Sequence, residues 1–178
     1  MVQVRSSCKQ GHDVLKEQYL LVDRKLEELK TALTNLRFES KVHRGKNVGT
    51  AARSAAFLND QWLRCLEFEE DVLFPFVEAR VPKLNVLLSH LQIDHIEQRK
   101  NVLQLVQKLD HLKTSEADDL VQDIESCFAS GMYVICFIRN HIFIKNNLFY
   151  KTVTRNLKDS DEKEFHQLLS KTKTFFLN

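Results

Sequence analysis

Apolar residues recur along most of this chain at alternating three- and four-residue steps, the spacing of one face of an α-helix. Four such stripes are visible, in residues 12–36, 58–76, 84–112 and 120–148. The second stripe passes through Val72, and the fourth ends at Leu148. The pattern predicts four long helices that each bury one face.

The segments between the stripes predict how the helices connect. Residues 38–51 contain two glycines and the basic side chains Lys41, Arg44 and Lys46, and are expected to form a solvated crossover loop. These basic residues can also form a small docking patch for an acidic partner, although a solvated loop is the simpler interpretation. Pro82 is expected to separate the second and third helices. Because short connections make consecutive helices antiparallel neighbours, we predict an all-α, up-and-down four-helix bundle.

Two capping patterns refine these boundaries. Ser115 with Asp118 resembles a capping box that opens the fourth helix, and Asp159 with Glu162 repeats it for a short fifth helix. The predicted organisation is one domain over residues 1–178, with the bundle over about 12–155 and a C-terminal helix over about 160–176.

Composition supports long helices. The 178 residues include only four glycines and two prolines, so the chain has few turn-forming residues. Charged residues make up 28% of the chain, and the formal net charge is +2. This balance gives no electrostatic reason to expect nucleic acid or an anionic membrane as a partner.

Targeting signals and cysteine spacing bear on the location of the protein. The first eleven residues have no apolar run of the kind a signal peptide needs, and the apolar stretch Met132–Ile138 is too short to span a bilayer. The four cysteines show no CxxC spacing and are expected to be reduced thiols. We therefore predict a cytoplasmic protein.

Polar side chains on the apolar stripes carry the functional information. They are His12, Tyr19, Glu69, His95, Gln98, His141 and Lys145. An unpaired buried charge is costly, so Glu69 and Lys145 need partners if they lie inside the bundle. Two histidines and a carboxylate on three stripes of one bundle are what a metal site requires.

Each of these residues also has a simpler interpretation. A single core histidine is more often hydrogen-bonded than metal-bound. Tyr19 can be a core ring with a satisfied hydroxyl, Cys65 a small buried apolar residue, and Glu69 a solvated side chain on a rotated helix. Four other histidines lie off or outside the stripes, and none is assigned to the site: His43, His90, His111 and His166.

Four short motifs resemble those of hemerythrin-like, HHE cation-binding domains. Residues 69–75, EEDVLFP, resemble the EE-x-x-LFP signature of that family. Residues 141–149 are similar to its HI-x-x-ENN-x-L motif, closest in kind to the branch that includes iron-centre repair proteins. Residues 15–19 resemble the L-x-E-E-H entry of its first helix, and residues 94–97 its EH-x-x motif. The match covers about residues 12–155.

The resemblance implies a four-helix bundle that holds a non-haem di-iron site through histidines and two bridging carboxylates. It also implies oxygen binding, nitric oxide or iron sensing, or iron delivery. Position by position, this chain keeps three of the implied ligands: Glu69, His95 and His141. Tyr19 and Cys65 stand at two histidine positions, Leu91 at another, and Lys145 replaces the second bridging carboxylate.

These departures shape the functional prediction. Without the second bridging carboxylate, a normal di-iron centre is not expected. The leading interpretation is a hemerythrin-like bundle with a decayed di-iron site and no catalytic residues, a binding or regulatory module for an unknown protein partner or small ligand. The alternative is a mononuclear iron or zinc protein that senses or carries O2, NO or iron. In that case Glu69, His95 and His141 bind one ion, with Tyr19 or Cys65 as a fourth ligand.

Three further expectations concern single residues. Lys145 lies one helical turn after His141 and is expected to replace the lost metal by pairing with Glu69, or else to extend to solvent. His12 lies about 10 Å along the helix axis from Tyr19 and is not expected to be a ligand, although a rival register starts the family motif there. Cys65 is expected to be an inert, buried thiol.

Overall fold

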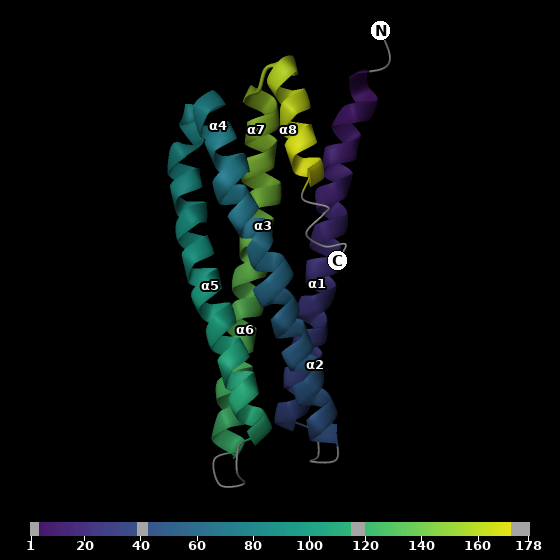
Figure 1. The fold of residues 1–178 in the computed structure, drawn as a ribbon, viewed down its shortest axis with the longest axis vertical. Helices are drawn as coiled ribbons and strands as arrows, with labels where there is room; N and C mark the ends of the chain where they lie inside the picture. The colour runs from purple at the N-terminus through teal and green to yellow at the C-terminus, as the bar shows by residue number, and fades with distance from the viewer. Residues whose placement is uncertain (1–3, 39–42, 115–119, 172–178) are drawn as a thin grey trace. The chain divides into compact units, whose positions relative to one another are not determined.

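The computed structural model describes the backbone of residues 4–38, 43–114 and 120–171, and the side chains from Glu17 onward within them. These residues are almost all helical, and no β-strand occurs among them (Figure 1). In chain order the elements are α1 (Val4–Phe38), α2 (Arg44–Phe57), η2 (Leu58–Trp62), α3 (Leu63–Phe68), η3 (Glu69–Leu73), α4 (Phe74–Arg80), η4 (Pro82–Leu84), α5 (Asn85–Thr114), α6 (Leu120–Ile144), η5 (Lys145–Phe149), α7 (Tyr150–Asn156) and α8 (Asp159–Lys171). The prediction of an all-helical protein is confirmed.

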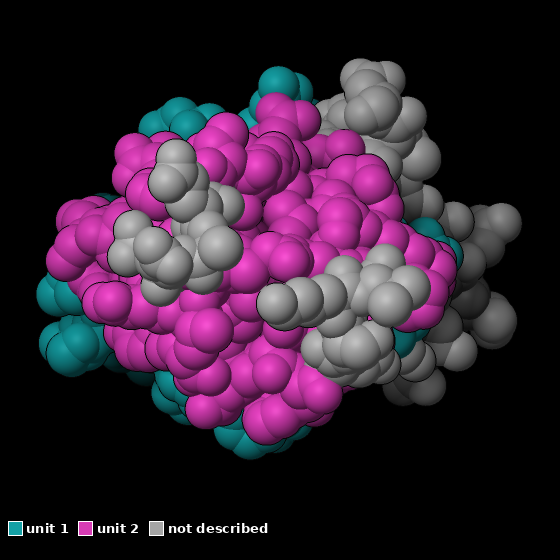
Figure 2. Space-filling model, turned by 90° about the horizontal axis from the view of Figure 1, so that it is seen from below, with its two compact units in different colours: residues 1–21, 63–95, 140–178 teal, residues 22–62, 96–139 magenta. Residues whose placement is uncertain are grey.

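The chain divides into two compact units, which Figure 2 shows in different colours. Unit 1 consists of residues 1–21, 63–95 and 140–178, and unit 2 of residues 22–62 and 96–139. Each unit therefore combines segments that are far apart in the sequence. The residues Glu69, His95 and His141 all belong to unit 1.

The predicted stripes agree with burial over most of their length. Every stripe position of α5, from Leu84 before its start to Leu112, is buried. In α1 the stripe is buried from Tyr19 to Leu36, whereas the side chains of His12 and Leu15 lie outside the described part of the chain. Helical period alone was sufficient to identify these faces.

Two π-helical turns, η3 and η5, shift the buried face by one residue. A π turn adds one residue to a turn of helix, so the face rotates relative to a regular 3.6-residue period. In η3 Leu73 is buried in place of Val72, which is half-buried. In η5 Phe149 is buried, whereas Leu148 is 52% exposed. The predicted burial of Val72 and Leu148 is therefore wrong.

The predicted crossover loop is also wrong over most of its length. Helix α2 begins at Arg44 and includes Gly45 and Gly49. Each glycine costs a helix interior about 1 kcal/mol relative to alanine. Burial of one face compensates for this cost, and the buried side chains are Asn47, Val48, Ala51, Ser54 and Ala55. Lys41 of the suggested basic patch lies outside the described residues.

The breaks near the other helix ends agree in part with prediction. α4 ends at Arg80, and Pro82 opens the short 3-10 turn η4, as expected. The Ser115–Asp118 pattern lies outside the described residues. The Glu162 amide donates to the Lys158 carbonyl at 2.8 Å, so Lys158 caps α8 and the predicted capping box is misplaced by one residue.

Helix α8 belongs to unit 1, where it lies beside α7 (Figure 1). The Phe165 ring is fully buried and stacks on Phe76, with ring centroids 5.9 Å apart. Arg80 Nη2 donates to Glu164 Oε2 at 3.1 Å. The last predicted residues of this helix, up to Phe176, lie outside the described part of the chain.

One helical stretch, Leu120–Asn156, is long and apolar enough to cross a membrane by length and composition, with a mean hydropathy of 1.4 in its best window. The apolar run Met132–Ile138, considered in the sequence, is too short to span a bilayer and so did not identify this longer stretch. The stretch also carries Arg139, which pairs with Asp23, and the buried Lys145. Paired charges of this kind are also typical of a core helix in a water-soluble domain, so the absence of a membrane partner stays a prediction.

Candidate metal centre

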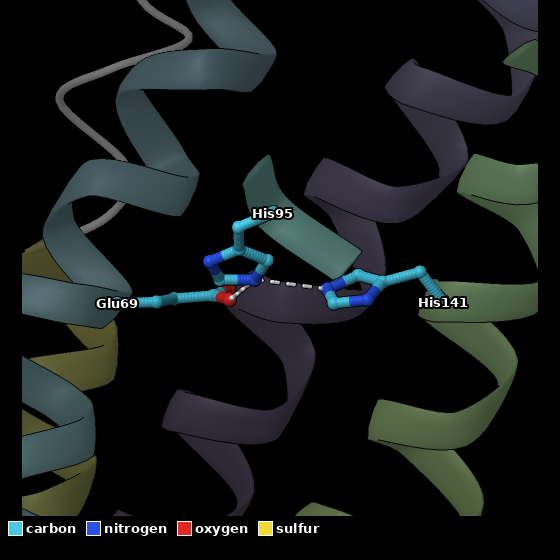
Figure 3. Close-up of side chains that lie close together, drawn as sticks. All are labelled: Glu69, His95 and His141. Atoms are coloured by element: carbon cyan, nitrogen blue, oxygen red, sulfur yellow. Dashed lines mark hydrogen bonds and ion pairs between the residues drawn. The ribbon is translucent and has the colours of Figure 1, made fainter. Parts of the chain in front are cut away.

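Three helical elements of unit 1 each contribute one potential metal ligand. Glu69 is the first residue of η3, His95 lies in α5, and His141 lies in α6 (Figure 3). The glutamate is 4% exposed, and both histidines are fully buried. One donor atom from each side chain lies within 4.8 Å of the other two. This buried group can hold one metal ion.

A carboxylate lies behind each imidazole ring. His95 Nδ1 is 2.8 Å from Glu70 Oε1, and His141 Nδ1 is 3.3 Å from Asp94 Oδ2. Because an ionised carboxylate only accepts hydrogen bonds, each Nδ1 is the donor. Metal-binding histidines usually make this contact, which fixes the ring and directs the Nε2 lone pair to the ion.

The two Nε2 atoms face each other at 3.1 Å (Figure 3). If both rings are neutral and protonated at Nδ1, both Nε2 atoms carry a lone pair and repel. Either one extra proton or a cation between them relieves this conflict. Burial lowers the pKa of His141 to about 4 against the opposing Asp94 bond, and Lys145 and His95 add to the decrease. The extra proton is therefore unfavourable on His141 at neutral pH.

The spacing of the donors also suits one ion. With metal–nitrogen bonds of about 2.0–2.1 Å, two nitrogens on one ion lie roughly 3.0–3.4 Å apart. The observed 3.1 Å falls within that range. Glu69 Oε2 lies 3.5 Å from His95 Nε2, and it has no hydrogen-bond partner among the described residues. Two imidazoles and one carboxylate form a set suited to Fe(II) or Zn(II).

Lys145 occupies the other side of the glutamate. Its ammonium donates to Glu69 Oε1, and the lysine side chain is fully buried. The alternative in which this lysine extends to solvent is therefore wrong. Burial alone raises the pKa of Glu69, but the Lys145 charge and the adjacent His95 ring outweigh it and lower the pKa to about 2. The carboxylate is thus ionised and has a different neighbour at each oxygen.

Tyr19 and Cys65 lie near this ion pair. The Tyr19 hydroxyl is 3.1 Å from that of Tyr150, and the Lys145 ammonium is 5.3 Å from the centre of the Tyr19 ring. Burial raises the pKa of Tyr19, so its phenol stays neutral. Burial and the Glu69 charge also raise the pKa of Cys65, which lies outside the three-residue group. A fourth ligand from Tyr19 or Cys65 stays a prediction.

Sequence reasoning missed the residues that orient this group. Glu70 and Asp94 each adjoin a site residue in the sequence, but their helical faces gave no sign that they hold imidazoles. Tyr150 was not assigned to the site either. A carboxylate next to a core-stripe ligand is a signal that could have found the first two. The prediction that His12 is not a ligand concerns a side chain outside the described part of the chain.

The sequence was also compared with models of known protein families and with curated proteins, and neither comparison finds a match. The residues and geometry of the site therefore carry the functional argument.

Proposed function

We propose that this chain is a hemerythrin-like four-helix bundle in which a former two-metal site has become a site for one ion. The observation that carries the proposal is that the two carboxylate oxygens of Glu69 have different neighbours. Its Oε1 accepts from the Lys145 ammonium, and its Oε2 lies on the side of His95 Nε2. In the resembled family a carboxylate bridges two metals with its two oxygens. Here the Lys145 ammonium supplies the positive charge that one of those two metals would provide.

The charge balance around the imidazoles supports a divalent cation. Glu69, Glu70 and Asp94 place three carboxylates against one buried ammonium and two imidazoles. With neutral imidazoles this set carries two negative charges. An Fe(II) or Zn(II) ion held by Glu69, His95 and His141 would balance them, and the bound ion would supply Lewis acidity or, as iron, redox chemistry.

The proposed role is a binding or regulatory module that responds to one metal ion. The three potential ligands are buried, and the sequence predicts no catalytic residues. We therefore propose a non-enzymatic, cytoplasmic protein whose metal-loaded and metal-free forms differ in stability and surface. The bound ion, or a diatomic ligand on it, is the signal that a partner would read.

The second candidate is a fully decayed site that binds no metal. The same Lys145–Glu69 ion pair favours it, because a buried ammonium repels a divalent cation. In this case the network only stabilises the bundle, and the module acts through another surface.

Metal analysis separates the two candidates. Protein purified without added metal is analysed for its elements and then titrated with Zn(II), and with Fe(II) under anaerobic conditions. One equivalent is expected, with loss of binding in His141→Ala and no loss in His90→Ala, a control at an exposed histidine of α5. Zero equivalents under all conditions would favour the decayed site. Two equivalents would show that Lys145 does not replace a metal.

Lys145→Glu provides an independent check. It removes the ammonium and restores a second carboxylate one turn after His141. Metal affinity is expected to rise, while stability without metal falls because two carboxylates then face each other in the core. Unchanged affinity would contradict the proposed role of Lys145.

A further inference from the structure

A groove that contains several polar side chains lies between α5 and α6 within unit 2. It has a volume of about 490 Å³, in the range of roughly 300–1,000 Å³ typical of small-molecule sites. Its lining residues are Gln104, Gln107, Lys108, His111, Asp123, Ser126 and Cys127. All of them belong to unit 2, whereas the candidate metal ligands belong to unit 1. The groove is therefore a feature separate from the metal centre.

Short side chains on α6 explain why the groove is open. Gln104, Lys108 and His111 follow helical steps along α5, beside its buried stripe. The facing positions of α6 carry Asp123, Ser126 and Cys127. Positions that flank a helix–helix contact commonly hold long side chains that close over the core. Because those of α6 are short, the space beside α5 is not filled.

The groove presents a cation next to neutral hydrogen-bonding groups. The Lys108 amine donates to the Ser130 hydroxyl, an uncharged acceptor. His111 Nδ1 lies 3.6 Å from Asp123 Oδ2 at the exposed side of the groove. The carboxamides of Gln104 and Gln107 both donate and accept hydrogen bonds. A ligand can therefore meet a positive charge, a carboxylate and two amides within one hollow.

Cys127 forms a neutral wall of this groove. Its side chain is buried, and burial raises the pKa of its thiol to about 11 despite the opposing charge of Lys108. The thiolate is the nucleophilic form, so this cysteine is not activated. The groove has the chemistry of a binding site rather than of a nucleophilic centre.

We propose that this groove binds a small polar molecule that carries a carboxylate or phosphate group. The oxyanion lies against Lys108 and replaces the Ser130 hydroxyl as the acceptor of its amine, because a charge-assisted hydrogen bond is stronger than a neutral one. Hydroxyl or amine groups of the ligand bind Asp123 and the two carboxamides.

The full chain, without added metal, is titrated with malate and separately with inorganic phosphate. Binding is followed through the NMR signals of the Gln104 and Gln107 side-chain amides. A saturable shift is expected with at least one probe, and Lys108→Met should weaken it about tenfold or more. Lys100→Met, at an exposed lysine of the same helix, should leave it unchanged.

Ser126→Leu tests the groove without removing a charge. The added side chain fills the hollow and is expected to abolish binding in a folded protein. Saturation by malate alone identifies a carboxylate ligand, and saturation by phosphate alone identifies a phosphate ligand. No saturable shift with either probe up to about 10 mM would overturn the proposal, as would equal affinity in Lys108→Met and Lys100→Met.

Discussion

Glu69 and Lys145 are 76 positions apart in the sequence, yet each is the first residue of a π-helical turn, and the two form a buried ion pair. π turns inside α-helices are rare and occur frequently at functional sites. Here the extra residue in each turn also moves the buried face, so that Leu73 and Phe149 pack inside. The local distortion of both helices therefore coincides with a buried charged contact within unit 1.

Loss of the Lys145 ammonium should destabilise the metal-free protein strongly. Lys145→Met leaves the buried Glu69 carboxylate without its cation, which costs about 3–5 kcal/mol for a broken buried ion pair. Urea denaturation measures the change. Lys151→Met, at an exposed lysine, should change stability by about 0.5 kcal/mol or less.

A double variant shows whether the pair itself is responsible. Glu69→Gln combined with Lys145→Met removes both charges, so much of the loss should be recovered. If Lys145→Met and the double variant were equally stable, the loss could not be assigned to an unpaired Glu69 carboxylate.

Gly131 in α6 should not tolerate a larger residue. A Cβ atom at this position would lie 2.1 Å from Leu33 Cδ1, so α1 must move or the leucine must change rotamer. Gly131→Ala is expected to destabilise by about 1–3 kcal/mol. Gly45→Ala is the matched control, since a Cβ there has no neighbouring atom within 4 Å and alanine favours the helix by about 1 kcal/mol. Thermal unfolding of both variants checks the prediction, which fails if both are stabilised.

Stability of the metal-free protein should fall on acidification. The folded-state pKa of His141 is about 4, below its ordinary value of 6.5, so the unfolded state binds more protons between these values. The contribution of the neutral His141 ring to folding stability is present above pH 6.5 and is lost as the pH falls toward 4. Glu69, with a folded-state pKa of about 2, adds a second loss below pH 4.5.

Urea denaturation at several pH values between 7 and 4 measures this dependence. His141→Gln should show a smaller loss of stability over that interval than the unmodified chain. His90→Gln, at an exposed histidine, should retain the original dependence. A dependence unchanged in His141→Gln would assign the effect to another group.

The cysteines should differ sharply in reactivity. Cys136 is exposed, whereas Cys65 and Cys127 are buried. Burial raises the pKa of both buried thiols, which lowers their thiolate fraction as well as their access to reagents. In a Cys8→Ser background, a thiol reagent should label Cys136 of the native protein quickly. It should label Cys65 and Cys127 only when the protein unfolds. Rapid labelling of Cys65 would show that the interior of unit 1 opens readily.

Helical period and residue chemistry were enough to predict much of this protein. The apolar steps identified the buried faces of α5 and of the described part of α1, because an amphipathic helix places every third or fourth residue on one side whatever it packs against. The same steps placed Glu69, His95 and His141 on inward faces. Their convergence could be expected because few polar side chains occupied those faces and buried polar groups need partners.

Tertiary structure decided what no single helix determines. Packing overrode the helix penalty of two glycines and began α2 at Arg44, and the π turns at Glu69 and Lys145 moved the buried face away from the regular period. Which oxygen of Glu69 meets Lys145, and which carboxylate holds each imidazole, depends on distances between elements far apart in the sequence. A one-dimensional pattern fixes the direction of a side chain around its own helix axis, but only the packed helices fix the few ångströms between donor atoms on which metal binding depends.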